Sequence, residues 1–369
     1  MELVNGSREY NPGALLSVEI DPSSPMRFLC FGAGAIGTYV GGSLALAGYE
    51  VVFIDRAEVT ESVRKSGLHL QFPAGEKVVK EPQVKNSIEE ALVTGPFYLA
   101  ILAIKSFDTQ ALLASLEPVW PILPTILSMQ NGVENESLLT EALGQERVIP
   151  GIVTSAVSRI APGCIVLERL RGIGIAGQNP LIRKLIPAVD QAGLKAKYYE
   201  NPASMKWSKM LTNLLANATS AILDLTPLEI LSDPGLFRLE IQMLSEALQV
   251  MAALGIPVTN LPDTPVKLLV WIAQSLPTWL SQPLLINSLG KGRGAKMPSF
   301  HIDLHSGRGK SEVDFLNGAV VRFGQKTGVP TPVNLWLNET LLGMTGGSIP
   351  HDRYLHRPDL LLAAVAESK

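Results

Sequence analysis

The sequence predicts an α/β protein in which a Rossmann-type dinucleotide-binding domain is followed by an all-helical carboxyl-terminal domain. A short apolar strand, a glycine-rich turn, a helix and a second apolar strand follow one another within residues 26–56. Apolar runs and helical stretches then alternate to about residue 200, which is typical of a parallel sheet. From Pro202 to about Met344 the pattern is helical, so the domain boundary is predicted near residue 200.

This division gives four segments, and the active site is expected in the cleft between the two domains. The chain has 369 residues, which is enough for two domains with separate cores. The segments are a flexible extension (1–25), the dinucleotide-binding domain (26–200), a helical substrate-binding and catalytic domain (201–348) and a tail (349–369).

The composition favours a soluble cytoplasmic enzyme. A formal net charge of -3 provides no basic surface of the kind that nucleic-acid binding requires. The two cysteines, Cys30 and Cys164, cannot form a disulfide framework, which favours a reducing compartment. Residues 1–25 lack the cationic start and the long apolar core of a secretory signal. The expected partner is a small-molecule substrate, and a homodimer is left open.

The longest uncharged run lies between Lys267 and Lys291 and raises the question of a membrane segment. Pro277 and Pro283 interrupt it, together with several Ser, Gln and Asn residues, so it is a poor match to a spanning helix. We therefore expect no membrane partner, and a buried or groove-lining helical insertion around residues 262–296.

The glycine-rich turn has the spacing and the context of a dinucleotide-binding motif. Gly32 permits a tight turn, Gly34 lets the backbone approach a pyrophosphate, and Gly37 allows the helix to lie close to the strand. The amino terminus of the helix then offers free N–H groups and the positive end of its dipole to the phosphates. The predicted cofactor contacts of this turn are Gly32, Ala33, Gly34, Ala35, Ile36 and Gly37.

Two residues at the end of the second strand point to different nicotinamide cofactors. Asp55 is suited to a ribose 2′-hydroxyl, as in NAD, whereas Arg56 would pair with a 2′-phosphate, as in NADP. From these residues alone, both cofactors stay open.

Lys105 and Asn131 each follow a predicted buried strand, at residues 95–104 and 125–129. Ligands of open α/β sheets bind at the carboxyl ends of the strands, so both side chains are expected beside the cofactor. A surface lysine and a turn-forming Asn-Gly pair are the alternative for each residue taken singly.

A lysine and two asparagines recur at four-residue intervals in the first helix predicted for the carboxyl-terminal domain. Because four residues turn an α-helix by about 40° beyond one full turn, Lys209, Asn213 and Asn217 would form one polar ridge. The residues between them are apolar, and a small oxygen-rich ligand would satisfy the ridge. A partly exposed, solvated helix face is equally compatible with this pattern alone.

Glu312 opens another helix predicted in the same domain. Its carboxylate either interacts with the helix amino terminus or binds polar ligand groups in the interdomain cleft. The tail contains His351, Asp352 and His356 without a spacing that supports metal ligation, so no metal is expected.

Together these motifs resemble those of the 2-dehydropantoate 2-reductase (ketopantoate reductase) family over about residues 26–345. The resemblance implies an amino-terminal Rossmann domain, a helical carboxyl-terminal domain, and reduction of 2-dehydropantoate to (R)-pantoate with NADPH in pantothenate and coenzyme A biosynthesis. The matching motifs are Gly32–Gly37, Ile104–Ser106, Gln130–Gly132, the Lys209/Asn213/Asn217 helix, and Ser311–Gly318 with the ending Gly328–Pro332.

The resemblance also implies roles for the residues that bind the substrate. Lys209 looks like the general acid that protonates the substrate carbonyl oxygen as hydride arrives. Asn213 and Asn217 are similar to the amides that hold the hydroxyl end of the substrate, and Ser299 to the serine that binds its carboxylate.

Five further residues match positions near the cofactor. Glu312 resembles the family glutamate of the catalytic cleft, and Asn131 the residue that contacts both cofactor and substrate. Lys105 and Ala156 are similar to cofactor-contacting residues, and Arg56 to the arginine that binds the 2′-phosphate, which favours NADP(H). Asp55 departs from the family pattern and keeps NAD(H) open.

The chain also differs from a typical member by its extension at 1–25 and by extra length around 262–296, which precedes Ser299 and could reshape the substrate pocket. Two alternative functions therefore remain: a related reductase of another 2-oxo acid, and a protein that senses NADP without catalysis.

Overall fold

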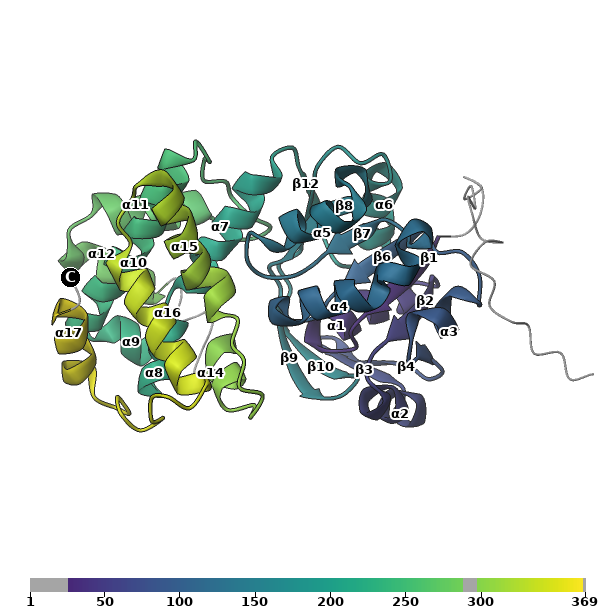
Figure 1. The fold of residues 1–369 in the computed structure, drawn as a ribbon, viewed down its shortest axis with the longest axis horizontal. Coiled ribbons are helices and arrows are strands. Elements are labelled where there is room, and N and C mark those ends of the chain that lie inside the picture. The colour runs from purple at the N-terminus through teal and green to yellow at the C-terminus, as the bar shows by residue number, and fades with distance from the viewer. Residues whose placement is uncertain (1–25, 288–296, 368–369) are drawn as a thin grey trace, which may run out of the picture.

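The computed structural model describes residues 26–287 and 297–367 and shows two lobes side by side (Figure 1). One lobe contains the β-sheets and the first six helices, and the other contains helices only. The predicted fold class is confirmed. The predicted flexible extension, residues 1–25, lies outside the described residues.

An eight-stranded sheet forms the centre of the Rossmann lobe. All its strand pairs are parallel except β8 with β11. Its inner strands are continuous buried apolar runs because helices cover both faces. In spatial order the strands are β12 (Ala196–Tyr199), β11 (Ile173–Ala176), β8 (Val148–Val153), β7 (Ile126–Ser128), β6 (Leu99–Leu102), β1 (Arg27–Phe31), β2 (Glu50–Ile54) and β5 (Gln83–Lys85). The helices of this lobe are α1 (Ala35–Leu46), α2 (Ala57–Ser66), α3 (Ile88–Leu92), α4 (Thr109–Leu116), α5 (Asn135–Leu143) and α6 (Ile182–Gln191).

A second sheet of four strands packs against the other side of α1, and the sequence analysis did not predict it. The close approach depends on small residues of α1, because a Cβ placed on Gly42 would lie 3.1 Å from the side chain of Leu70. In spatial order the strands are β4 (Gly75–Val79), β3 (Leu68–Phe72), β10 (Cys164–Arg169) and β9 (Ala156–Ala161). Helix α1 is therefore buried between two sheets, which holds its amino terminus and the glycine turn in place.

The helical lobe is built around α10 (Pro234–Ala253), which contacts α7, α9, α11, α15, α16 and α17. Its buried face lies in one large apolar core. The other helices are α7 (Pro202–Leu214), α8 (Ala218–Leu223), α9 (Pro227–Ser232), α11 (Val266–Ser275), α12 (Thr278–Leu285), α14 (Ser299–Leu304), α15 (Val313–Thr327), α16 (Pro332–Thr345) and α17 (Pro358–Glu367).

The prediction that Lys209, Asn213 and Asn217 lie on one helix is wrong, because Asn217 lies outside it. Helix α7 ends at Leu214, and Asn217 immediately precedes α8. Between the two helices Ala216 adopts a left-handed conformation with a φ of 50°. Its N–H donates to the carboxylate of Glu240 from α10, at 2.7 Å, instead of continuing the helix. This contact comes from a residue far along the chain, so the local pattern does not reveal it.

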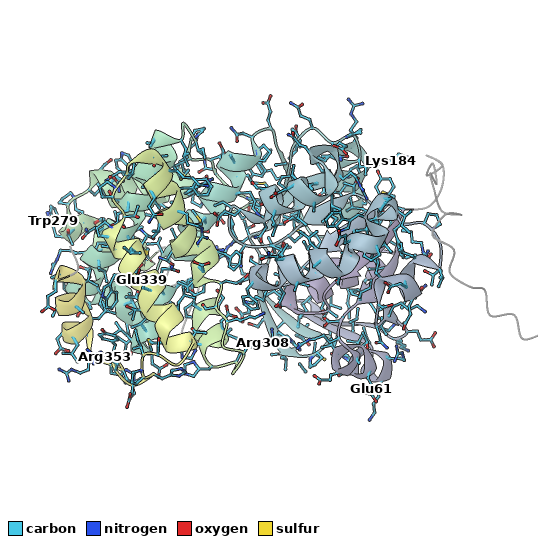
Figure 2. All side chains as sticks on the ribbon, in the orientation of Figure 1. Glu61, Lys184, Trp279, Arg308, Glu339 and Arg353 are labelled. Carbon is cyan, nitrogen blue, oxygen red and sulfur yellow. The ribbon has the colours of Figure 1, made fainter. Side chains whose placement is uncertain are left out.

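The insertion and the tail also take definite positions. The insertion begins at the lobe junction, where the carbonyl oxygen of Pro262 accepts from Thr154 Oγ1 at 3.2 Å and Asp263 pairs with Lys195 at 3.4 Å. Helix α12 lies far from the Rossmann lobe, and its Trp279 projects outward (Figures 1 and 2). Residues 288–296 of the insertion lie outside the described part of the chain. The predicted tail contains α17, which contacts α10 and buries Leu361 and Val365. Within residues 26–287 and 297–367, no helix is both long and apolar enough to span a bilayer.

Candidate active site

The glycine turn joins β1 to the amino terminus of α1. Gly32 has a φ of +98°, which residues with a side chain rarely adopt. A Cβ on Gly37 would lie 1.7 Å from the carbonyl oxygen of Gly32, so helix and turn can meet only at a glycine. By contrast, a Cβ on Gly34 would have no atom within 4 Å. The turn is thus closed on its protein side and open above Gly34, as a cofactor pyrophosphate requires.

Asp55 and Arg56 follow β2. The first bonds the backbone of the glycine turn, and the second is exposed. Asp55 Oδ2 accepts the N–H of Ala33 at 2.7 Å, and its Oδ1 accepts the N–H of Arg56 at 2.8 Å. The carboxylate therefore already stabilises the backbone of the turn. The side chain of Arg56 is 66% exposed, and its Nε lies 4.0 Å from Asp55 Oδ1.

Lys105 follows β6 and pairs with two carboxylates from the helical lobe. Its Nζ lies 2.7 Å from Glu312 Oε2 and 2.9 Å from Asp303 Oδ1. Glu312 stands directly before α15 and is buried, but its carboxylate does not cap that helix. It also accepts the backbone N–H of Ser106 at 3.2 Å. Lys105 and Glu312, both predicted from the sequence, are thus brought together, and they connect the two lobes.

The electrostatics of this group favour one cation beside one firmly ionised carboxylate. Burial lowers the pKa of Lys105, but the charges and hydrogen bonds of Glu312 and Asp303 outweigh it and raise the pKa overall. Burial raises the pKa of Glu312, while the charge and hydrogen bond of Lys105 and the hydrogen bonds of Ser106 lower it, with a net decrease. The pKa of Asp303 is raised, mainly by burial and further by Glu312. Of the two carboxylates, Asp303 is therefore the one that is protonated first as the pH falls, while Lys105 stays charged.

Lys209 lies on α7 and is joined to the Rossmann lobe through two amides. Its Nζ donates to Asn213 Oδ1 at 2.9 Å, and Asn213 Nδ2 donates to Asn131 Oδ1 at 2.9 Å. Asn131 follows β7, and its carbonyl oxygen lies 3.0 Å from Ser106 Oγ. Since Ser106 Oγ also lies 3.2 Å from Glu312 Oε1, one polar network extends from Lys209 to the Lys105 pair. The half-buried Lys209 ammonium is therefore linked through Asn213 to Asn131, at the carboxyl end of β7.

Asn217 and Ser299 extend the polar network of Lys209 toward α14 through the carbonyl oxygen of Asn213. Asn217 Nδ2 lies 3.3 Å from Ser299 Oγ and 3.0 Å from the carbonyl oxygen of Asn213, while its Oδ1 accepts the N–H of Phe300 at 3.1 Å. Both N–H groups of the amide are thus directed at protein acceptors. Because Ser299 Oγ accepts from Asn217, its own hydrogen can be donated to a ligand.

Ala156 is the first residue of β9 and is half-buried. It comes three residues after β8, which runs parallel to β7 in the main sheet. Its position is therefore near the same carboxyl edge as Asn131, in line with the predicted cofactor contact.

Residues of the lobe junction that were not predicted from the sequence include Asp303, Ser106 and Lys206. Asp303 lies four residues after Ser299 on α14, and Ser106 directly follows Lys105. Each is therefore close in sequence to a residue that was predicted for the site, and this proximity could have indicated it. Lys206 is 5% exposed on α7, and its Nζ lies 2.6 Å from Glu136 Oε1 and 2.8 Å from the carbonyl oxygen of Gln130. This buried ion pair holds the helix of Lys209 against the loop of Asn131.

A Rossmann turn that is open to a pyrophosphate, with a lysine and amides brought to its sheet edge by a helical lobe, defines an NAD(P)-dependent oxidoreductase. The chain belongs to the ketopantoate reductase family. Residues 28–178 match the family described as Ketopantoate reductase PanE/ApbA, and residues 201–344 match its C-terminal counterpart. The predicted family and enzyme class are thus confirmed.

Individual relatives agree with this membership. A 2-dehydropantoate 2-reductase of Pyrococcus horikoshii is 29% identical over 335 residues, covering 88% of this chain and 100% of the relative. A PanE/ApbA family ketopantoate reductase of Ralstonia eutropha has a TM-score of 0.73 at 26% identity, with 87% and 99% of the two chains covered. A D-mandelate dehydrogenase, solved with NADH and anilino(oxo)acetate, has a TM-score of 0.71 at 22% identity over 88% and 99%, and shares the fold.

Proposed function

We propose that this protein reduces 2-dehydropantoate to (R)-pantoate with NADPH, in the route to pantothenate and coenzyme A, with Lys209 as the general acid. The observation on which this depends is the hydrogen-bonded series from Lys209 through Asn213 to Asn131, because it brings an ammonium to the cofactor edge of the sheet. Curated relatives of Pyrococcus horikoshii and Archaeoglobus fulgidus bear the name of this reaction.

Lys209 would supply the proton that the reaction needs. When bound, a reduced nicotinamide would supply the hydride for the carbonyl carbon. The carbonyl oxygen then gains negative charge, and a donor within about 3 Å must neutralise it. The bond from Lys209 Nζ to Asn213 Oδ1 orients the ammonium, and the amide of Asn213 is in turn held by Asn131.

The remaining residues would bind and orient the substrate and the cofactor. Ser299 would donate its hydroxyl hydrogen to the substrate carboxylate, with Asn217 holding the serine oxygen. Glu312 would keep Lys105 charged and in place for contact with the cofactor. We assign substrate recognition to α7 and α14, because Lys209 and Asn213 lie on α7 and Ser299 begins α14.

Arg56 would select NADPH over NADH. Because Asp55 is engaged with backbone N–H groups, Arg56 is the exposed charge at the place of a ribose 2′-phosphate. We expect Arg56→Ala to raise the KM for NADPH at least about tenfold and the KM for NADH less than about twofold. Steady-state kinetics with both cofactors measures this, and Lys65→Ala, at the far end of α2, is the matched control. Equal changes for both cofactors would contradict the assignment.

The function itself is tested by following the absorbance of the reduced nicotinamide after ketopantoate is added to enzyme with NADPH or NADH. We expect turnover with ketopantoate, and a kcat/KM at least about tenfold higher with NADPH. Faster turnover of another branched 2-oxo acid would identify a related reductase instead. Tight NADP binding without oxidation by any 2-oxo acid would identify a cofactor-sensing protein.

A further inference from the structure

Glu240 is a fully buried carboxylate on α10 that is directed into the junction between α7 and α8. Its exposed fraction is 0%. One oxygen accepts the backbone N–H of Ala216 at 2.7 Å, and the other accepts the hydroxyl of Thr219. None of these three residues belongs to the site described above, but Asn217 lies between the two that Glu240 binds.

The contact with Glu240 accompanies an unusual backbone conformation. Ala216 has a φ of 50°, a left-handed conformation that residues with a Cβ rarely adopt. Its N–H leaves the helical hydrogen-bond series and is satisfied by the carboxylate instead. Glu240 therefore stabilises the place where the polar face of α7 stops and the chain turns toward α14.

This turn determines what Asn217 can reach. On an uninterrupted α7, Asn217 would point along the same face as Lys209. After the turn, its amide instead binds Ser299 Oγ and the N–H of Phe300, at the start of α14. The same short helix carries Asp303, which binds Lys105. The direction of Asn217 therefore decides where α14 presents its ligand-binding residues.

We propose that Glu240 is a positioning residue for substrate binding: it holds the α7–α8 junction so that Asn217 places Ser299 for the substrate carboxylate. The proposal rests on the proposed function, in which Ser299 contacts the substrate and Asn217 holds the oxygen of Ser299. Glu240 acts through Asn217 and touches neither substrate nor cofactor.

The test is Glu240→Gln, because the amide keeps the shape of the carboxylate but presents an N–H₂ group to one of the two donors. We expect the KM for ketopantoate to rise about tenfold, while the Kd for NADPH stays within about twofold. The matched control is Glu246→Gln on the same helix. Glu246 is also buried, but its carboxylate accepts the N–H groups of Val333 and Asn334 at the start of α16. We expect this control to lower Tm and to leave the KM within about twofold.

Two further variants separate positioning from general stability. Glycine adopts a positive φ without strain, so Ala216→Gly added to Glu240→Gln should return the KM to within about threefold of wild type. In an Asn217→Ala background, Glu240→Gln should change the KM less than about twofold, because its route to Ser299 is already lost. If the double variant raises the KM by the product of the two single effects, the proposal is overturned. An unchanged KM in Glu240→Gln alone would also overturn it. If Glu240→Gln does not fold, Thr219→Val removes the hydroxyl that Glu240 accepts from and should raise the KM about threefold. An unchanged KM in Thr219→Val would then overturn the proposal.

Hydrogen exchange distinguishes a failure of this proposal from a failure of the proposed function. Glu240→Gln should speed amide exchange at Phe300 and along α14, whereas Glu246→Gln should speed it at the start of α16. This measurement needs no substrate. If wild type does not turn over ketopantoate but α14 responds as expected, the function is wrong and the positioning by Glu240 holds. If α14 exchange is unchanged in Glu240→Gln, the positioning is wrong whatever the substrate.

Discussion

Replacing Lys209 by alanine is expected to lower kcat at least about a hundredfold while the Kd for NADPH changes less than about twofold. The carbonyl oxygen would lose its proton donor, but the glycine turn, to which we assign cofactor binding, lies between β1 and α1 in the other lobe and is untouched. Stopped-flow measurement of a single turnover, together with a fluorescence titration of NADPH, separates the two effects.

Lys209→Arg distinguishes a proton donor from a positive charge. An arginine keeps the charge but does not release its proton, so it should be impaired about as strongly as the alanine variant. Glu312 does not compete for this role in the structure, since its carboxylate lies 2.7 Å from Lys105 Nζ. Near-normal turnover of Lys209→Ala would remove Lys209 from the role of acid, and recovery by arginine alone would reduce it to charge stabilisation.

Replacing Gly34 by alanine is expected to raise the Kd for NADPH at least about tenfold while Tm stays within about 2 °C. No protein atom lies within 4 Å of the position that the new Cβ would take, so the fold has room for it. The methyl group would instead occupy the space into which a pyrophosphate approaches the turn. Calorimetric titration of NADPH and a thermal melt measure the two quantities.

Gly37→Ala is the matched control for Gly34→Ala. Its Cβ would lie 1.7 Å from the carbonyl oxygen of Gly32, so the turn and α1 must separate. We expect this variant to lose stability as well as cofactor binding. If Gly34→Ala binds NADPH normally, or if both variants lose stability equally, the turn is not the pyrophosphate site that its motif indicates.

The elements around the glycine turn were predictable because their signals are local. The strand, turn, helix and second strand of residues 27–54 follow one another with glycines at fixed positions, and each is present as predicted. Lys105 and Asn131 were placed at one sheet edge because parallel neighbouring strands end on the same side. The resemblance to a known family added the roles of Lys209, Ser299 and Glu312, which no local pattern assigns.

Features that depend on partners distant in the sequence were not predictable in this way. The second sheet pairs β3 with β10, about a hundred residues further along the chain, and neither segment alone shows that pairing. Asp303 has no motif of its own, and its contact with Lys105 exists only because the two lobes meet.

From the sequence itself came the fold class, the order of the elements and the family, because hydrophobic periodicity and turn chemistry act between near neighbours in the chain. Only the tertiary structure decided how the polar groups pair. A carboxylate of α10 accepts the N–H of Ala216 just beyond the end of α7, and the lysine of the Rossmann lobe is paired with two acids of the helical lobe. The physical reason is that a buried hydrogen-bonding group must find a partner wherever the fold provides one, and that partner can be any distance away in sequence.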